Sequence, residues 1–312
     1  MKRKEFIKVG ALTSAALSFP QLAFAETVTS SDKKLTLLHT NDQHSRIEPF
    51  PPTYTQNPNQ GGFARRASLI NKIRNEEASV LLVDSGDVFQ GTPYFNFFGG
   101  KLEFKLMSKM GYEASTMGNH EFDNGLAGFK KQLPHARFDF LCSNYDFSNT
   151  ILEGCTRDYK IIEKNGIRIG LFGIGVELNG LVSKNNYLET QYLDPIEIAQ
   201  DKADMLKKEK KCDLVICLSH LGYQYPLDPD KVCDVKLCQQ TSNIDLVLGG
   251  HTHTFFKEPE KYINKAGKEV ILNQVGWAGL LLGRIDYLFS KDNKIKGIAY
   301  NTLPIDENIE TA

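Results

Sequence analysis

Short runs of hydrophobic residues, each closed by a polar or glycine-containing turn, recur along the first half of the chain. Leu35–Leu38 and Val80–Val83 are apolar runs of strand length. Between them, apolar residues recur every three or four positions, which predicts an amphipathic helix over Phe63–Asn75. A second helix is predicted over Phe97–Met110, and a third strand over Glu113–Met117. Strands therefore alternate with helices from the start of the fold.

The second half of the chain continues this alternation. Asn165-Gly166 between two apolar runs is a strong hairpin signal, and Asp194 precedes a helical pattern over Pro195–Lys207 as its N-cap. The predicted strands are Tyr159–Ile162, Ile167–Phe172, Asp213–Leu218, Ile244–Leu248, Val270–Asn273, Leu280–Tyr287 and Ile295–Asn301. We expect the last three to be antiparallel. With no internal repeat and no strong linker, the pattern predicts one α/β domain over residues 26–312.

The first 25 residues carry the pattern of a secretory signal. Basic residues surround the start, a mostly apolar run extends from Val9 to Phe19, and Ala-Phe-Ala ending at Ala25 forms a cleavage site. The run is too short to remain as a membrane anchor. Arg3 and Lys4 resemble a twin-arginine signal with lysine in place of the second arginine, so the twin-arginine and general secretory routes both stay open. We expect an exported protein, periplasmic or extracellular, with no membrane span in its mature form.

Composition excludes some classes of protein. Hydrophobic residues at 41% and charged residues at 24% are ordinary for a globular chain, which excludes extensive disorder. The formal net charge is −1, and it becomes −4 without the leader, because the leader holds four basic residues and one acidic residue. The chain has no excess of basic residues that would attract nucleic acid, so nucleic acid is not an expected partner.

The cysteines all lie in the exported part, where disulfides can form. They are Cys142, Cys155, Cys212, Cys217, Cys233 and Cys238. We expect Cys233 and Cys238 to bond, since they lie in a stretch rich in Pro and Asp. Cys212 and Cys217 are five apart on a predicted strand and point to opposite faces, so they cannot bridge. Without a Cys-x-x-Cys pair, a cysteine zinc site is not expected.

Residues of metal-ligand types follow five of the predicted strands, at the point where each strand ends. They are Asp42 with His44, Asp87, Asn119 with His120, His220, and His251 with His253. Carboxylate and imidazole groups suit Zn, Mn, Fe or Co. Asp42 and His44 would lie on the same side of the chain if their segment were extended, and so would His251 and His253. Any single cluster has an ordinary interpretation, such as an exposed histidine or a capped turn, but five compatible clusters indicate a metal centre. His39 is interpreted as a core or supporting residue.

These motifs, taken in order, resemble the signature of the calcineurin-like metallophosphoesterases, and within them the 5′-nucleotidase and UDP-sugar hydrolase family. They are Asp-x-His at 42–44, Gly-Asp at 86–87, Gly-Asn-His-Glu-Phe-Asp at 118–123, His220 with Gly222, and Gly-His-x-His at 250–253. The resemblance covers about residues 35–303. It implies an α/β fold in which two packed mixed β-sheets are flanked by helices, a four-layer α-β-β-α sandwich.

The resemblance also implies the residues of a site with two divalent metal ions, of Zn, Mn, Co or Fe. One ion would be held by Asp42, His44, Asp87 and His253. The second would be held by Asp87, Asn119, His220 and His251, with Asp87 bridging. His120 and Asp123 match the catalytic pair of the family. His120 would stabilise phosphoryl oxygens or protonate the leaving alkoxide, and Asp123 would orient its ring.

Family members that hydrolyse nucleotides carry a second, C-terminal domain that binds the base, and this sequence stops at Ala312, where that domain would begin. We therefore expect a catalytic domain whose substrate is a small-molecule phosphate ester. A separately encoded substrate-binding domain is a candidate partner. The aromatic cluster Phe95–Phe98 is expected to pack a helix into the core.

Three functions stay open at this point. The first is an exported phosphomonoesterase acting on nucleoside 5′-phosphates. The second is a phosphodiesterase or pyrophosphatase acting on cyclic nucleotides or nucleotide sugars. The third is a metal-bearing binding or scaffold subunit without activity. The pair His120 and Asp123 argues against the third, because a purely structural metal site needs no acid or base that is not a ligand.

Overall fold

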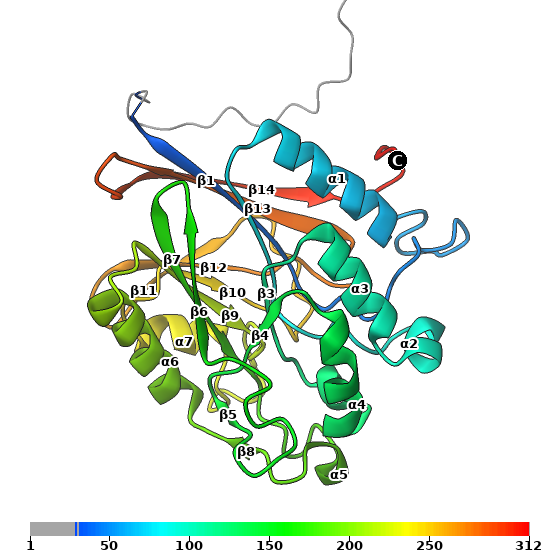
Figure 1. Cartoon of the computed structure of the whole chain (residues 1–312). Coiled ribbons are helices and arrows are strands. Elements are labelled where there is room, and N and C mark those ends of the chain that lie inside the picture. Colours follow the sequence, from blue (N-terminus) through cyan, green and yellow to red (C-terminus); the bar gives the residue numbers. More distant parts are fainter. Residues whose placement is uncertain (1–28, 30, 312) are drawn as a thin grey trace, which may run out of the picture.

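Two six-stranded β-sheets form the centre of the protein (Figure 1). The structure is a computed structural model that describes residues 29 and 31–311, so the predicted leader lies outside the described residues. The first sheet has the order β14 (Ile295–Pro304), β13 (Leu281–Phe289), β1 (Lys33–Thr40), β2 (Val80–Asp84), β3 (Ala114–Thr116) and β4 (Asp139–Leu141). The second has the order β11 (Glu260–Ile263), β12 (Glu269–Asn273), β10 (Leu246–Leu248), β9 (Leu214–Ser219), β7 (Ile167–Ile174) and β6 (Tyr159–Lys164). A separate short pair consists of β5 (Tyr145–Asp146) and β8 (Gln191–Tyr192).

Both sheets are mixed. In the first, β1 to β4 are parallel, whereas β13 and β14 add antiparallel strands. In the second, β7, β9, β10 and β12 are parallel and carry antiparallel strands at both edges. The carboxyl ends of parallel strands lie at one edge of a sheet, which is where α/β proteins bind their ligands.

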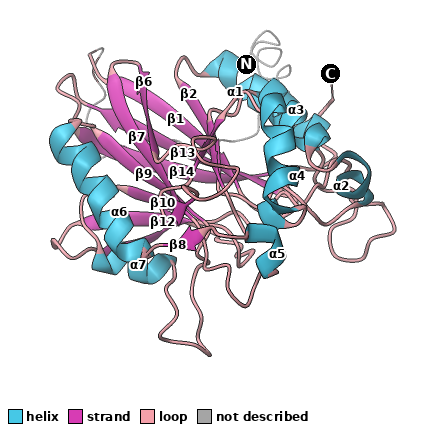
Figure 2. Ribbon diagram, turned by 60° about the horizontal axis from the view of Figure 1, so that its bottom comes forward, coloured by secondary structure: helices cyan, strands magenta, loops and turns pink. Residues whose placement is uncertain are grey.

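Helices cover the outer face of each sheet (Figure 2). They are α1 (Phe63–Glu76), α2 (Pro93–Phe98), α3 (Lys101–Met110), α4 (Gly125–Gln132), α5 (Lys184–Tyr187), α6 (Pro195–Asp204) and α7 (Asp234–Gln240). Short 3-10 turns span His120–Phe122 and Leu133–His135, and a π turn, Met205–Glu209, continues α6. Asp194 caps α6 as predicted, because its carboxylate accepts hydrogen bonds from two backbone N–H groups of the first turn.

The buried side chains fall into layers that follow from the alternation of residues along the strands. Leu35 and Leu37 of β1 pack between the two sheets, against residues such as Ile216 of β9, while Leu38 points to the helices on the other face. Helices α1, α3 and α4 cover the first sheet, and α6 and α7 cover the second. The predicted four-layer sandwich is therefore confirmed.

The prediction of one helix over Phe97–Met110 is wrong at its start, because the structure has two helices there, α2 and α3. Gly99 and Gly100 take φ of 60° and 95°, and they separate α2 from α3. A Cβ at Gly100 would lie 2.1 Å from the ring of Phe89, so only glycine fits there. The expectation that the aromatic cluster packs into the core holds for Phe95, but Phe97 is 82% exposed and Phe98 is 49% exposed. The short helix α2 can bury only one of its faces.

The three C-terminal strands were predicted to be antiparallel, and this holds for β13 and β14, which pair with each other. β12 belongs to the other sheet, where it is antiparallel to β11 but parallel to β10. A five-residue strand with three apolar residues does not encode which sheet it joins, because the partner is selected by tertiary packing.

The expected disulfide between Cys233 and Cys238 is also wrong. Both thiols are buried and free, and the other four cysteines are free as well. Residues 234–240 form helix α7 instead of a loop, with Cys233 at its N-cap. Positions five apart on a helix are separated by about 7.5 Å along its axis and point in different directions, which is too far for a disulfide.

Within residues 29 and 31–311, no helix is both long and apolar enough to cross a membrane.

Candidate metal centre

The loops that carry the predicted ligands converge at the carboxyl ends of strands from both sheets. Asp42 and His44 follow β1, Asp87 follows β2, and Asn119 and His120 follow β3. From the second sheet, His220 follows β9, while His251 and His253 follow β10. The side-chain atoms of these loops form three overlapping groups of potential metal ligands, each with atoms within 4.8 Å of one another. The structure therefore brings the sequence-predicted residues together from five separate loops.

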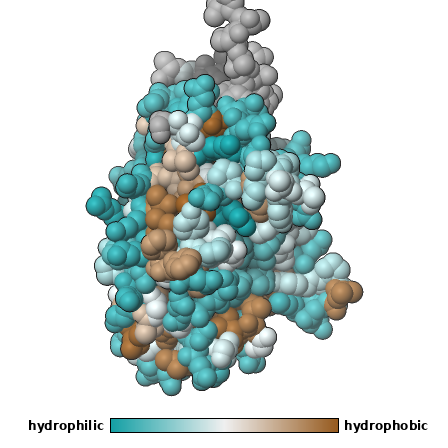
Figure 3. Space-filling model, turned by 90° about the vertical axis from the view of Figure 1, so that its right-hand side faces the viewer, coloured by the Kyte–Doolittle hydropathy of each residue, from teal (hydrophilic) through white to brown (hydrophobic). Residues whose placement is uncertain are grey.

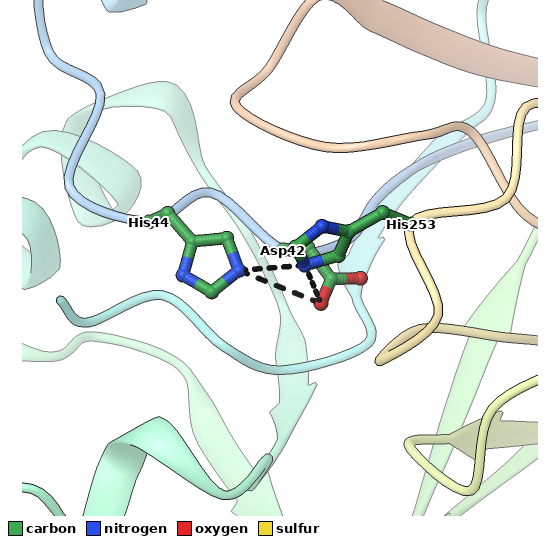
Figure 4. A group of neighbouring side chains, drawn as sticks. All are labelled: Asp42, His44 and His253. Carbon is green, nitrogen blue, oxygen red and sulfur yellow. Dashed lines mark hydrogen bonds and ion pairs between the residues drawn. The ribbon is translucent and has the colours of Figure 1, made fainter. Parts of the chain in front are cut away.

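The first group contains Asp42, His44 and His253 (Figure 4). The Nε2 atoms of the two histidines face each other at 2.9 Å. Asp42 Oδ1 lies 3.3 Å from His253 Nε2 and 3.8 Å from His44 Nε2. A carboxylate oxygen and two imidazole nitrogens directed at one point form the donor set that a divalent transition metal takes.

The second group contains Asp87, His220 and His251. His220 is fully buried, and its Nε2 lies 3.0 Å from Asp87 Oδ2. Its other ring nitrogen lies 2.6 Å from the carbonyl oxygen of Ser85, which as an acceptor fixes the proton on Nδ1 and leaves Nε2 as a donor atom for a metal. Burial alone would raise the pKa of Asp87, but the charges of His220, His120 and His44 hold it well below its usual range.

Asn119 supplies a direct test of whether these residues fit a metal. Its side-chain Oδ1 is buried and has no hydrogen-bond partner in the described residues, a costly state for an amide oxygen. A metal ion bound by the neighbouring Asp87 group would give this oxygen a partner. The residues present therefore fit divalent metal binding.

Asp87 and His44 connect the groups. The third group consists of His44, Asp87 and His120. Asp87 is therefore a member of the second group and lies close to His44 of the first. The backbone of His251 adds a further link, since its N–H lies 3.0 Å from Asp42 Oδ2. A carboxylate in this position is suited to a ligand shared by two ions.

The ligand loops are not extended, so the condition under which each pair would share one side is not met. Positive φ values occur at Asp42 (50°), His44 (48°), Asp87 (54°), His251 (70°) and His253 (52°). Asp42 and His44 therefore meet through left-handed turns, whereas His251 and His253 join different ligand groups. Such conformations are costly for non-glycine residues, and they persist where the surrounding structure imposes them, often at functional sites.

Gly118 allows two of the loops to touch. A Cβ at this position would lie 2.2 Å from Asp87 Oδ1 and 2.6 Å from His220 Nε2. No side chain fits there without displacing the Asp87 group.

His120 and Asp123 form a hydrogen-bonded pair at the edge of the cluster. His120 Nδ1 lies 2.8 Å from Asp123 Oδ2, and both side chains keep about a third or less of their surface exposed, 32% and 26%. Burial lowers the pKa of His120, but the hydrogen bond with Asp123 and the charge of Asp87 outweigh it and raise the pKa to about 9. The backbone N–H of His120 also donates to Asp87 Oδ1 at 2.8 Å. The second ring nitrogen of His120, Nε2, takes part in none of the hydrogen bonds described here.

Sequence reasoning missed the role of Glu121. Its buried carboxylate accepts hydrogen bonds from the N–H groups of Asp87 (2.9 Å), Val88 (2.8 Å), Phe89 (3.3 Å) and Gly118 (2.6 Å). It thereby fixes the loop that carries Asp87. The motif at 118–123 contains this residue. No local sequence pattern, however, indicates that a carboxylate accepts hydrogen bonds from backbone N–H groups 32 to 34 positions away.

His39 lies in the core, as one of the two interpretations from sequence has it. It is fully buried, and its Nε2 lies 2.8 Å from Asn273 Nδ2. Burial lowers its pKa to about 3, so the ring is neutral.

Comparison with known proteins decides the family. The model of a family described as calcineurin-like phosphoesterase matches residues 35–255. The chain belongs to this family. Members of this family are phosphoesterases, enzymes that hydrolyse phosphate esters.

The relatives of this calcineurin-like phosphoesterase include 5′-nucleotidases. The 5′-nucleotidase of Vibrio cholerae is 32% identical over 295 residues, which cover 88% of this chain and 52% of the relative. The snake venom 5′-nucleotidase of Gloydius brevicauda is 32% identical over 91% of this chain and 50% of its own length. Among solved structures, a 5′-nucleotidase precursor from Thermus thermophilus matches with a TM-score of 0.79 and 30% identity, over 89% of this chain and 55% of that one. The chain thus spans about half the length of these relatives.

Proposed function

We propose that this calcineurin-like phosphoesterase is a dinuclear-metal phosphomonoesterase that acts on nucleoside 5′-phosphates. The observation that carries the proposal is the linking of two groups of ligand atoms through the third group, which shares His44 with one and Asp87 with the other, with the His120–Asp123 pair beside them. The similarity to 5′-nucleotidases supports a nucleotide as the substrate. One ion would be held by Asp42, His44, Asp87 and His253, and the other by Asp87, Asn119, His220 and His251.

Two divalent ions at such a centre supply charge neutralisation for the phosphoryl group and lower the pKa of a bound water. His120 would donate a hydrogen bond from Nε2 to a phosphoryl oxygen or to the departing alkoxide. Asp123 would keep the ring in the orientation that this requires, through its contact with Nδ1. Glu121 would hold the loop of Asp87 in place.

A product panel on residues 26–312 tests the proposal. We expect phosphate to be released from AMP and from p-nitrophenyl phosphate in the presence of Zn, Mn, Co or Fe. UMP from a UDP-sugar, or an opened ring from a cyclic nucleotide, with no phosphate from AMP, would instead identify a pyrophosphatase or a phosphodiesterase. Failure to cleave any ester with all four metals would favour a binding subunit.

We also propose that selectivity for the base depends on a second domain outside residues 26–312. The relatives named 5′-nucleotidase are about twice as long as this chain, and a metal centre by itself recognises phosphate oxygens and not a base. The exposed face of α2 offers a contact surface, since Phe97 and Phe98 line a hollow of about 580 Å³ together with Arg46. Apolar patches interrupt the hydrophilic surface on the side of the molecule that Figure 3 shows.

Steady-state kinetics on AMP, GMP and CMP test this second proposal. The chain alone should show high KM values and little preference among the bases, and added second domain should lower KM and create a preference. Tight, base-selective hydrolysis by residues 26–312 alone would place the specificity site within them.

We propose, finally, that the protein is exported and cleaved after Ala25. The support is the leader pattern in residues 1–25. Mass spectrometry of the exported protein should give Glu26 as the N-terminal residue. A protein that retains residues before Ala23, or that carries a lipid, would contradict this.

A further inference from the structure

Trp277, the only tryptophan of the chain, stacks on a predicted metal ligand. Its ring lies parallel to the imidazole of His253, with an interplanar angle of 8° and ring centroids 5.6 Å apart. The same tryptophan also makes an edge contact with His44, with ring centroids 6.4 Å apart and an interplanar angle of 65°. Trp277 is half-buried and contacts two members of the first ligand group.

The turn that carries Trp277 is hydrogen-bonded to the loop of Asp42 and to the loop of His253. Asn41 Nδ2 donates to the carbonyl oxygen of Gly276 at 2.6 Å, and the N–H of Ala278 donates to the carbonyl oxygen of Asp42 at 2.7 Å. On the other side, the N–H of Gly276 donates to the carbonyl oxygen of Thr254, next to His253, at 2.9 Å. Gly276 and Ala278 have φ of 72° and 56°. The unusual backbone of this turn is thus held on both sides of the tryptophan.

A further aromatic ring, that of Phe50, packs against Trp277. Phe50, which is buried, meets its ring edge to face, with centroids 5.9 Å apart and an interplanar angle of 68°. Tyr54 stacks in turn on Phe50, with centroids 4.7 Å apart. Trp277 therefore has little freedom to move away from His253.

His253 needs such support, because it lacks the usual one. Histidine ligands of metals normally donate their second ring N–H to a carbonyl or carboxylate, as His220 does to Ser85. Within the described residues, His253 makes a ring hydrogen bond only through Nε2, to His44, and none through Nδ1. Its side chain is also 39% exposed. A flat aromatic ring can orient an imidazole by stacking where no acceptor is present.

We propose that Trp277 is a positioning residue for the first metal site, and that its ring sets the orientation of His253 toward a divalent cation. This inference rests on the proposed two-metal function. It predicts that replacement of Trp277 weakens the binding of one ion and leaves the other ion in place, because the Asp87, His220 and His251 group does not contact the tryptophan turn through any of the bonds described above.

Metal affinity, measured by titration of chelator-treated protein with Mn²⁺ or Zn²⁺, tests the proposal without reference to activity. Trp277→Ala should weaken one of the two binding events by about 10- to 100-fold, the usual effect of losing a residue that supports a ligand. Trp277→Phe should recover most of the affinity, since it keeps a stacking ring. Phe97→Ala is the matched control: it removes an exposed aromatic ring of α2 that has no part in the stack on Trp277, and should leave both affinities unchanged. Wild-type affinity in Trp277→Ala, or an equal loss in Phe97→Ala, would overturn the proposal.

A second measurement keeps the tryptophan in place. Since Trp277 is the only tryptophan, its fluorescence should change when the first site binds Co²⁺ or Mn²⁺. The change should persist in His251→Ala, whose first site is intact, and disappear in His253→Ala. Persistence of the change in His253→Ala would overturn the stacking role. A wild-type chain that binds no divalent ion would overturn the proposed function, and this inference with it.

Discussion

Replacement of Asp87 by alanine should abolish the binding of both metal ions and reduce turnover by on the order of 10³-fold or more. The carboxylate lies beside the ligand groups of both sites, so one substitution removes an anionic ligand from each. Metal ions supply several kcal/mol of transition-state stabilisation, and each 1.36 kcal/mol corresponds to about a factor of ten in rate. Elemental analysis should therefore show well below one ion per chain, and p-nitrophenyl phosphate hydrolysis should fall with it.

Asp84→Asn is the matched control for this prediction. Asp84 is an equally buried carboxylate three residues earlier, but it accepts hydrogen bonds from Thr40 Oγ1 at 2.6 Å and from the Gly86 N–H at 2.9 Å and belongs to none of the ligand groups. Its amide variant should lower stability but keep both ions. If Asp87→Ala retained two ions per chain while Asp84→Asn lost them, the assignment of Asp87 as a shared ligand would be wrong.

His120→Ala should separate catalysis from metal binding. A positioned acid or base contributes about 10²- to 10⁴-fold to a rate, so kcat should fall within that range. The metal content should stay near that of the wild type, because our assignment gives His120 no place among the ligands. Asp123→Asn should have a smaller effect, as it leaves the imidazole in place but weakens the contact of 2.8 Å that orients it.

Kinetics and elemental analysis on the same preparations decide this prediction. Loss of metal in His120→Ala, together with retention in His220→Ala, would show that the division of the two histidines between catalysis and binding is wrong. An unchanged kcat with both ions present would remove His120 from the chemistry altogether.

The features that the sequence predicted well are those that local patterns encode. The apolar run Leu35–Leu38 predicted a strand, and its four residues are buried within β1. The end of each parallel strand could be located, and with it the loops that carry the ligand residues. Because parallel strands deliver their carboxyl ends to one edge, five separate clusters were expected to meet, and the structure brings them together.

The features that were missed depend on contacts between distant segments. The apolar run of β12 has the same composition whichever sheet it joins, and only its packing against β10 places it in the second. The glycines at 99 and 100 are visible in the sequence, but the ring of Phe89 that makes a side chain impossible at Gly100 is not. Glu121 and Trp277 support the site through bonds and ring contacts across separate loops, so no periodicity could indicate them.

The backbone of the ligand loops could not be predicted either. Side-chain alternation assumes extended segments, whereas Asp42, His44 and His253 take left-handed conformations that sequence propensity disfavours. The surrounding hydrogen bonds impose them, including the bond from Asn41 Nδ2 to Asp42 Oδ2 at 2.6 Å.

A metal titration of the chelator-treated chain, followed by elemental analysis and by release of phosphate from AMP, tests the central claim most directly. If the two ligand groups form one dinuclear centre, two ions should bind per chain, and activity should appear only as the second is taken up. Full hydrolysis of AMP in the presence of chelator, or activity that saturates with a single ion per chain, would contradict a dinuclear phosphomonoesterase.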